Sequence, residues 1–191
     1  NVLWSKQFVP AVTRNFCWTI IEKNPGGNYI ISNEPVDDPN SNVNSELFEI
    51  NRTTGAVAGG IYKNYDLGSS EELSNLKVYN GFLYGVGRFS DGPSPPFFRN
   101  TLVKLNLSTG DVEWARLGHR PKNATARFYG ADLEIDNNEI YSCYAGDPNG
   151  TSIVNTNFYI QKTSLDGNLT WLKQYDLPGT NDWGFEINKT N

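Results

Sequence analysis

Six asparagines of this 191-residue chain are followed two positions later by serine or threonine, and no proline intervenes. Such a triplet is an acceptor for N-linked glycosylation, which adds a bulky polar sugar to a surface loop of a secreted protein. About three triplets would arise by chance in a chain this rich in asparagine. The excess favours a secreted eukaryotic glycoprotein, with a bacterial surface protein as the alternative. The six candidate glycan anchors are Asn51, Asn106, Asn123, Asn149, Asn168 and Asn188.

Few other residues have the type and spacing that catalysis needs. His119 is the only histidine, and it has no serine or cysteine motif nearby, so neither a catalytic triad nor a histidine-based zinc site is predicted. The acidic stretch 34–40 and the loop 146–150 offer oxygen ligands, but neither has the spacing of a calcium loop. We therefore predict no catalytic residues, no metal ligands and no cofactor.

The elements that must position these residues follow from a ten-residue phrase that occurs three times. Gapless copies cover 46–55, 101–110 and 158–167, and each ends in glycine. Asn51 and Asn106 take the same position in their copies. A fixed period of about 55 residues indicates a repeat architecture.

A tryptophan recurs with the same period. Trp114 and Trp171 each lie four residues after a phrase-ending glycine, and Trp4 fits the same register. In the first copy Gly59 takes this position. We expect the contact that tryptophan makes in the other copies to be weaker in the first copy, or to be made by another side chain such as Tyr62.

Each period is predicted to contain four short strands. Two apolar runs ahead of the phrase flank a tight-turn signal, of which Asn80-Gly81 is the strongest. The phrase itself is the third strand, because its final glycine can supply the positive φ of a turn, and the tryptophan lies on the fourth. No window shows an apolar stripe at helical spacing. This pattern is typical of the four-stranded blade of a β-propeller.

The segment 102–114 reads as an apolar strand, a polar turn that ends in Thr-Gly, and an apolar strand with tryptophan. It resembles the blade repeat of quinoprotein-type β-propellers, and the copy that ends at Trp171 resembles the related repeat of secreted surface propellers. The resemblance implies that Trp4, Trp114 and Trp171 pack between neighbouring blades. It also implies a candidate redox enzyme with pyrroloquinoline quinone, calcium and a pair of adjacent cysteines. The chain has no adjacent cysteines, so only the structural repeat carries over.

The predicted fold is therefore all-β, with three full blades of four antiparallel strands plus a strand at each end. The blades cover about 13–66, 67–122 and 123–178 of a single repeat domain over 1–191, and the end strands are Val2–Phe8 and Trp183–Asn188. Closed propellers typically have four to eight blades. We expect a slice of a longer propeller, completed by further chain or by other copies.

Cys17 and Cys143 are the only cysteines and are candidates for a disulfide. The repeat places them two blades apart, whereas a disulfide needs Cα atoms within about 7 Å. Buried thiols, or bonds to other partners, are the alternatives.

Charge and hydropathy limit the partners. The net charge is −5, the basic residues are dispersed, and no apolar run approaches the length of a membrane span. The sequence thus predicts neither a nucleic-acid partner nor a membrane span. We expect a non-enzymatic extracellular glycoprotein segment with a structural or adhesive role, as a subunit of a surface assembly or filament. The alternatives are a propeller module that binds carbohydrate or protein, through its ring face or the Pro-Phe loop at 91–98, and a fragment of a quinone-dependent oxidoreductase.

Overall fold

The computed structural model describes twelve strands in three four-stranded antiparallel sheets, and none of the described residues is helical. This confirms the all-β class and the four-stranded antiparallel unit. The described residues are 14–36, 44–65, 70–91, 97–118, 128–146, 156–175 and 186–189.

Each sheet is a meander in which strands adjacent in the chain pair with one another. Sheet one contains β1 (Arg14–Glu22), β2 (Tyr29–Val36), β3 (Ser45–Ile50) and β4 (Val57–Tyr65). Sheet two contains β5 (Ser70–Tyr79), β6 (Phe82–Asp91), β7 (Phe97–Asn106) and β8 (Val112–Leu117). Sheet three contains β9 (Phe128–Asp136), β10 (Glu139–Gly146), β11 (Asn157–Ser164) and β12 (Leu169–Tyr175).

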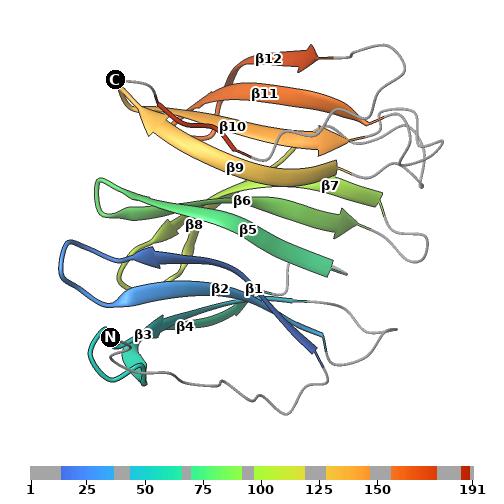
Figure 1. Ribbon diagram of the computed structural model, residues 1–191. Coiled ribbons are helices and arrows are strands. Elements are labelled where there is room, and N and C mark those ends of the chain that lie inside the picture. The colour runs from blue at the N-terminus through green and yellow to red at the C-terminus, as the bar shows by residue number, and fades with distance from the viewer. Residues whose placement is uncertain are drawn as a thin grey trace.

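The three sheets follow one another in chain order, and each lies within one of the expected blade ranges (Figure 1). Their first strands are neighbours, because β5 packs against β1 on one side and β9 on the other. The described sheets form a row and do not close into a ring. The expected end strand Val2–Phe8 lies outside the described residues, and the described part of the other, 186–188, has no strand pairing.

The turns have the backbone conformations that the sequence predicts. The phrase-ending glycines have φ values of 66° at Gly55, 75° at Gly110 and 79° at Gly167. Asn80 and Gly81 both have positive φ, at 48° and 77°, which is the requirement of a type I′ hairpin turn. Local sequence therefore determines where each strand reverses.

The gapless alignment of the three phrases is wrong by one residue in the third copy. Asn51, Asn106 and Ser164 are the equivalent residues, because each carbonyl accepts a hydrogen bond of 2.8 or 2.9 Å from the N–H of its phrase-ending glycine. The alignment had matched Thr163 to the asparagines. The third turn is one residue shorter, and this shifts the register of β11 relative to the other copies.

The residue in the tryptophan position of sheet one is Ile61. Trp114 pairs with Lys104 of β7, and Trp171 pairs with Lys162 of β11. Glu49 is the equivalent residue of β3, and the register between β3 and β4 places Ile61 opposite it. Another side chain does take this position, but the assignment of Gly59 to it and the choice of Tyr62 as the replacement are wrong, since a wider bulge in β4 displaces Gly59 and Tyr62 is 64% exposed. Ile61 is fully buried.

The two largest apolar clusters of the described core lie in the gaps between neighbouring sheets. The layer between sheets one and two contains Ile30, Leu47, Ile61, Tyr65, Leu73, Leu76, Leu83, Val103 and Leu105. The layer between sheets two and three contains Tyr84, Val86, Leu102, Leu133 and Ile140, with Trp114 and Leu165 packed against it. Two smaller buried clusters consist of Ile31, Phe48 and Ile50 on the other side of sheet one, and of Tyr144 stacked on Tyr159 in sheet three.

Candidate functional site

The polar chemistry of the described residues is concentrated at the two junctions between neighbouring sheets. The first junction joins sheets one and two, and the second joins sheets two and three. Each junction has a polar contact between inner strands and a contact between an outer strand and a turn of the next sheet.

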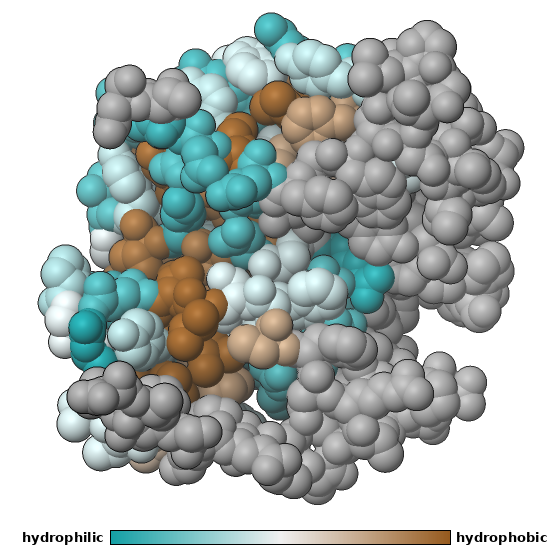
Figure 2. All heavy atoms as spheres, viewed as in Figure 1, coloured by the Kyte–Doolittle hydropathy of each residue, from teal (hydrophilic) through white to brown (hydrophobic). Residues whose placement is uncertain are grey.

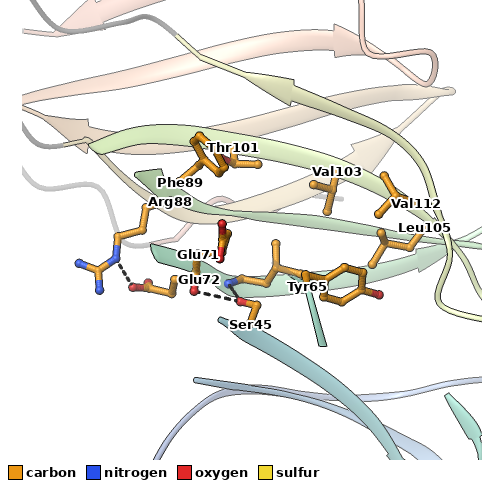
Figure 3. A pocket seen from close by; sticks show the side chains of 11 residues that line it. Ser45, Tyr65, Glu71, Glu72, Arg88, Phe89, Thr101, Val103, Leu105 and Val112 are labelled. Carbon is orange, nitrogen blue, oxygen red and sulfur yellow. Dashed lines mark hydrogen bonds and ion pairs between the residues drawn. The ribbon is translucent and has the colours of Figure 1, made fainter. Parts of the chain in front are cut away.

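At the inner part of the first junction, one arginine lies between two buried carboxylates. Arg88 of β6 approaches Glu34 of β2 to 3.4 Å and Glu72 of β5 to 2.7 Å, and Figure 3 shows the second of these ion pairs. Glu34 also accepts a hydrogen bond of 2.8 Å from the indole N–H of Trp18. Three strands of two sheets are thus joined through one charged cluster.

The cluster contains one positive charge for two buried carboxyl groups. Burial raises the pKa of Glu72, the charge of Arg88 lowers it and that of Glu34 raises it, with a net value of about 7. An ion pair in a poorly solvated site does not fully repay the desolvation of its charges. Glu72 therefore titrates near neutral pH.

The cavity beside this cluster is too small for a substrate. Its volume is about 20 Å³, and Ser45, Tyr65 and Thr101 are among its lining residues. Such a space holds one water molecule at most. Ser45 instead joins the sheets, because its hydroxyl donates to the carbonyl of Glu71 at 3.3 Å and accepts the N–H of Leu73 at 2.9 Å.

At the outer part of the first junction, the β7–β8 turn packs against β4. The hydroxyl of Tyr65 donates to the carbonyl of Gly110 at 2.6 Å, and Lys63 pairs with Asp111 at 2.7 Å. A Cβ added at Gly110 would lie 3.0 Å from Ile61 and closer still to Lys63. The turn can approach β4 only because its buried residue is glycine.

The outer part of the second junction repeats this arrangement one sheet further along. The indole N–H of Trp114 donates to the carbonyl of Leu165 at 3.2 Å, and Arg116 donates to the carbonyl of Asp166 at 3.2 Å. A Cβ added at Gly167 would lie 2.9 Å from Arg116 and 3.2 Å from Trp114. Trp114 thus lies where an outer strand meets the turn of the next sheet.

Each of the two described tryptophans from the repeat also packs edge to face on a tyrosine of its own sheet. Tyr84 and Trp114 have ring centroids 6.3 Å apart at an interplanar angle of 62°, and Tyr141 and Trp171 have the same values. Trp4 lies outside the described residues. Sheets two and three therefore each carry the same edge-to-face pair of tyrosine and tryptophan on the equivalent side of the sheet.

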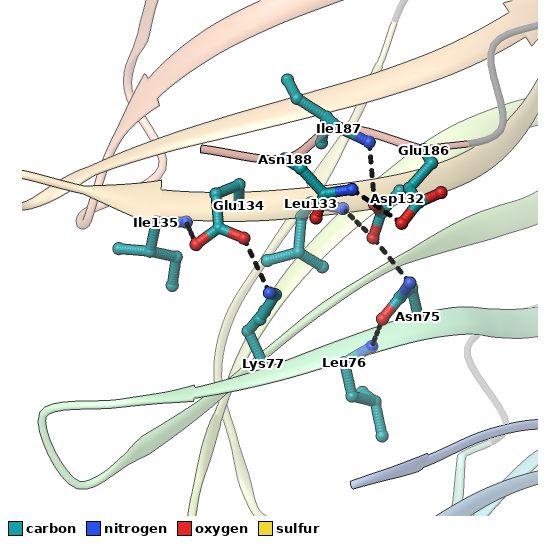
Figure 4. A network of polar contacts seen from close by, with 10 residues as sticks. All are labelled: Asn75, Leu76, Lys77, Asp132, Leu133, Glu134, Ile135, Glu186, Ile187 and Asn188. Carbon is teal, nitrogen blue, oxygen red and sulfur yellow. Dashed lines mark hydrogen bonds and ion pairs between the residues drawn. The ribbon is translucent and has the colours of Figure 1, made fainter. Parts of the chain in front are cut away.

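The inner part of the second junction is a ladder of polar side chains between β5 and β9 (Figure 4). Asn75 donates to Asp132 at 2.6 Å, and Lys77 pairs with Glu134 at 2.7 Å. The second carboxylate oxygen of Asp132 accepts the backbone N–H of Ile187 at 2.9 Å. Burial raises the pKa of Asp132, whereas hydrogen bonds from Ile187 and Leu133 lower it.

The predicted glycan anchors that the structure describes are Asn51, Asn106, Asn168 and Asn188. Asn51 and Asn106 open equivalent turns, where the side-chain oxygen of each accepts two backbone N–H groups at 2.9–3.2 Å. Asn168 and Asn188 are exposed, whereas Asn123 and Asn149 lie outside the described residues, as does His119. The four described asparagines come from different parts of the fold and do not form a single site.

Cys17 and Cys143 are not joined to each other. Cys17 is exposed on β1 of sheet one and Cys143 is buried on β10 of sheet three, with sheet two between them. Burial raises the pKa of the Cys143 thiol to about 11, which keeps it protonated at neutral pH. The predicted separation by two blades accounts for this placement.

A larger groove lies at the outer part of the second junction. Its volume is about 450 Å³, and Arg99, Arg116, Gln161, Thr163 and Leu172 are among its lining residues. Thr163 is buried, and within the described part of the chain its hydroxyl has no hydrogen-bond partner. The groove therefore combines polar groups with apolar walls.

Sequence reasoning missed the cluster of Glu34, Glu72 and Arg88 altogether. These residues come from different periods and have no motif spacing. Two successive glutamates at 71–72 inside a strand-forming segment were the only signal, because charged residues are rarely fully buried unless paired.

Comparison with models of known families and with curated proteins gives no match. Within the described residues, no cluster of three or more histidine, cysteine, aspartate or glutamate side chains is placed to hold a metal ion. The same part of the chain contains no helix long and apolar enough to cross a membrane. The geometry of the junctions and turns must therefore support any functional proposal.

Replacement of Glu72 by glutamine should change how stability depends on pH. Because the folded-state pKa of about 7 exceeds the ordinary value of 4.5, the folded protein binds more protons between these pH values and its stability falls as pH rises. Glu72→Gln removes the buried negative charge, so we expect it to be about 1–3 kcal/mol more stable than the wild type at pH 8. Denaturant unfolding at pH 5 and pH 8 measures this.

Glu49→Gln is the matched control. Although burial raises the pKa of the Glu49 carboxyl, hydrogen bonds from Lys23 and Asn28 produce a net lowering. The stability gained from this charge is present at neutral pH and lost as pH falls, so Glu49→Gln should destabilise the protein at pH 8. Equal stability of Glu72→Gln and the wild type at pH 8 would contradict the assignment of Glu72.

Trp114→Ala should cost about 2–4 kcal/mol, near the low end of the range for buried aromatics because Trp114 is half-buried. Trp171→Ala is its control, since Trp171 packs on Tyr141 with the same geometry, but none of the described sheets covers it. Loss of that edge-to-face pair should cost about 0.5–1.5 kcal/mol. Thermal and denaturant unfolding at low protein concentration measure both, and equal losses would show that the second junction does not depend on Trp114.

Proposed function

We propose that the chain is part of a β-propeller-type extracellular glycoprotein, non-enzymatic, with a structural or adhesive role in a surface assembly or filament. The resemblance of its repeat to quinoprotein-type and secreted surface propellers supports the ring architecture. The two equivalent junctions also support the ring architecture. At each junction the inner strands of the two sheets are in contact, and an outer strand contacts a turn of the next sheet.

The observation that carries the glycoprotein proposal is the geometry of the turns at Asn51 and Asn106. In both turns the side-chain oxygen of the asparagine accepts hydrogen bonds from the backbone N–H groups of the residues two and three positions later. The amide nitrogen, to which an N-linked glycan would be attached, takes no part in these turn contacts; that of Asn106 donates at 3.4 Å to the exposed carboxylate of Glu113. Thr53 and Ser108, the hydroxyl residues of these triplets, are exposed.

The position of these turns suits a structural role. They join the third and fourth strands, and the fourth strands β4, β8 and β12 are largely exposed. Glycans there would cover outer edges that could otherwise pair with strands of other molecules. Association would then be limited to the faces of the end sheets.

Expression in eukaryotic secretory cells tests this function. We expect the intact mass to fall on enzymatic removal of N-linked glycans, and Asn51→Asp and Asn106→Asp each to lose the mass of one glycan. Aspartate retains the oxygen that accepts the turn hydrogen bonds, so the unfolding midpoint of the deglycosylated protein should change little.

Thr53→Ser is the matched control, because it preserves the acceptor triplet and should preserve the glycan at Asn51. A secreted protein whose mass does not change on deglycosylation would contradict the proposal.

The groove at the second junction favours a second candidate, a module that binds carbohydrate. Arginine, glutamine and threonine side chains beside leucines can bind the hydroxyl groups and the apolar face of a sugar. A glycan array with the wild type and Gln161→Ala tests it. Reproducible binding that is lost in the variant supports this candidate, and the absence of any sugar binding rejects it.

A further inference from the structure

We propose that the groove at the outer part of the second junction binds an acidic saccharide, a sugar whose ring carries a carboxylate. This inference rests on the carbohydrate-binding candidate above and names the class of sugar. The groove lies between the outer strands β7 and β8 of sheet two and β11 and β12 of sheet three. Its volume of about 450 Å³ falls within the range of ligand pockets, about 300–1,000 Å³.

The equivalent space at the first junction is filled by the protein itself. Val103 and Leu105 of β7 line the small cavity there, together with Tyr65 of β4. All three belong to the apolar cluster between sheets one and two. The space that remains has a volume of only about 20 Å³. The two junctions share one plan, but one holds core side chains where the other holds a groove.

Gly118 opens the groove because it stands where the first junction has a large aromatic side chain. Tyr65 pairs with Ser45, and the N–H of Gly118 donates to the carbonyl of Asn100 at 2.7 Å. Ser45 and Asn100 are equivalent, since each lies six residues before the asparagine that opens its turn. A Cβ added at Gly118 would lie 1.7 Å from Oδ1 of Asn100, so the absence of a side chain here is required.

The wall of the groove formed by sheet three is polar where the first junction is apolar. In the register of the turns, Gln161 and Thr163 of β11 take the positions of Val103 and Leu105. Both line the groove, and they are only 9% and 3% exposed. Polar side chains in place of core residues cost stability unless they are hydrogen-bonded. Their position beside an enlarged space therefore favours a ligand.

Gln161 supplies the hydrogen-bonding group of this wall. Within the part of the chain that the structure describes, its side-chain amide makes no hydrogen bond. The amide is both donor and acceptor, so it can bind sugar hydroxyl groups in either direction. Leu172 and Leu169 of β12 pair with Gln161 and Thr163 and also line the groove. They provide an apolar surface for the C–H groups of a sugar ring.

Arg116 makes the groove selective for a negative charge. Its guanidinium donates to the backbone carbonyls of Ala115 and Asp166 at 3.2 Å, and it lies 5.4 Å from the ring centre of Trp114. These contacts do not neutralise the charge, and Arg116 has no ion pair within the described residues. Its exposed guanidinium retains N–H donors in the planar arrangement that matches a carboxylate.

The other charges around the groove agree with this selectivity. The described residues that line it include two arginines and no aspartate or glutamate. The second arginine, Arg99, donates to the carbonyl of Gly118 at 3.1 and 2.7 Å from two of its nitrogens, which fixes the end of β8. Because charge-assisted hydrogen bonds are roughly twice as strong as neutral ones, an acidic sugar should bind better than its neutral counterpart.

The inner part of the same junction has its polar groups already paired. Lys77 pairs with Glu134 and Asn75 donates to Asp132. In Figure 2, hydrophilic surface gathers where β9 lies in Figure 1. At this junction the groups that remain for a ligand are thus those of the outer groove.

Pairs of sugars that differ by one acidic group test the ligand class. Isothermal titration calorimetry of the full chain compares methyl glucuronide with methyl glucoside, and sialyllactose with lactose. We expect at least one acidic sugar to bind about tenfold tighter than its neutral counterpart, and the pair that does so distinguishes uronic from sialic acids. This preference should decrease as the salt concentration rises.

Two variants separate the roles of charge and hydrogen bonding. Arg116→Gln retains an N–H donor for the carbonyl of Asp166 but should bind both sugars of a pair alike. Gln161→Leu, with an apolar side chain of similar size, should lose binding of both sugars. Its unfolding midpoint should not fall, because a buried polar group without a partner is removed.

Lys63→Gln is the matched control, since Lys63 takes the position of Arg116 at the first junction, and it should bind like the wild type. Equal affinity for acidic and neutral sugars, or a preference that survives in Arg116→Gln, would overturn the acidic class and leave the carbohydrate candidate. The absence of binding to these sugars and to every glycan of the array would reject both. The glycoprotein proposal is decided separately, by the mass lost on deglycosylation.

Discussion

The arrangement of the sheets depends on a buried glycine in the turn between the third and fourth strands. This residue needs positive φ to reverse the chain, and it also lies against the outer strand of the preceding sheet, where a side chain would collide. One residue therefore serves both the local turn and the long-range contact. Its carbonyl at Gly110, and the neighbouring carbonyls of the turn before Gly167, accept the hydrogen bonds of the preceding sheet. Spacing of these glycines by about one period consequently fixes how successive sheets stack.

The inner strands show how stacking is favoured over edge pairing. Asp132, Glu134 and Asn75 each accept the backbone N–H of the residue that follows them. These side chains occupy donors that an edge strand would otherwise offer to another strand. The same side chains bind the next inner strand through Asn75 to Asp132 and Lys77 to Glu134. Neighbouring sheets thus meet through side chains, which keeps them separate as sheets.

Local signals in the sequence were sufficient for the turns and the strand order, because positive φ and alternation are properties of short segments. They were insufficient where partners come from different periods. The register of β11 depends on a turn one residue shorter. The tryptophan position of sheet one holds Ile61 because the bulge in β4 is wider, and Ile61 lies beside Glu49, which is bound by Lys23, Asn28 and the N–H of Ile61. Gly60 leaves room for this carboxylate. Likewise, the pKa of Glu72 depends on Glu34 and Arg88, which only the fold brings together.

The glycan-acceptor turns and the docking turns are the same segments, and this limits where glycans can lie. The turn that begins at Asn106 packs against β4 through Gly110, while Ser108 and Thr109 on its other side are exposed. A glycan on Asn106 would project from the exposed side and leave the junction intact. The proposed glycans would lie beside the outer strands, where their bulk would oppose lateral pairing with strands of another molecule.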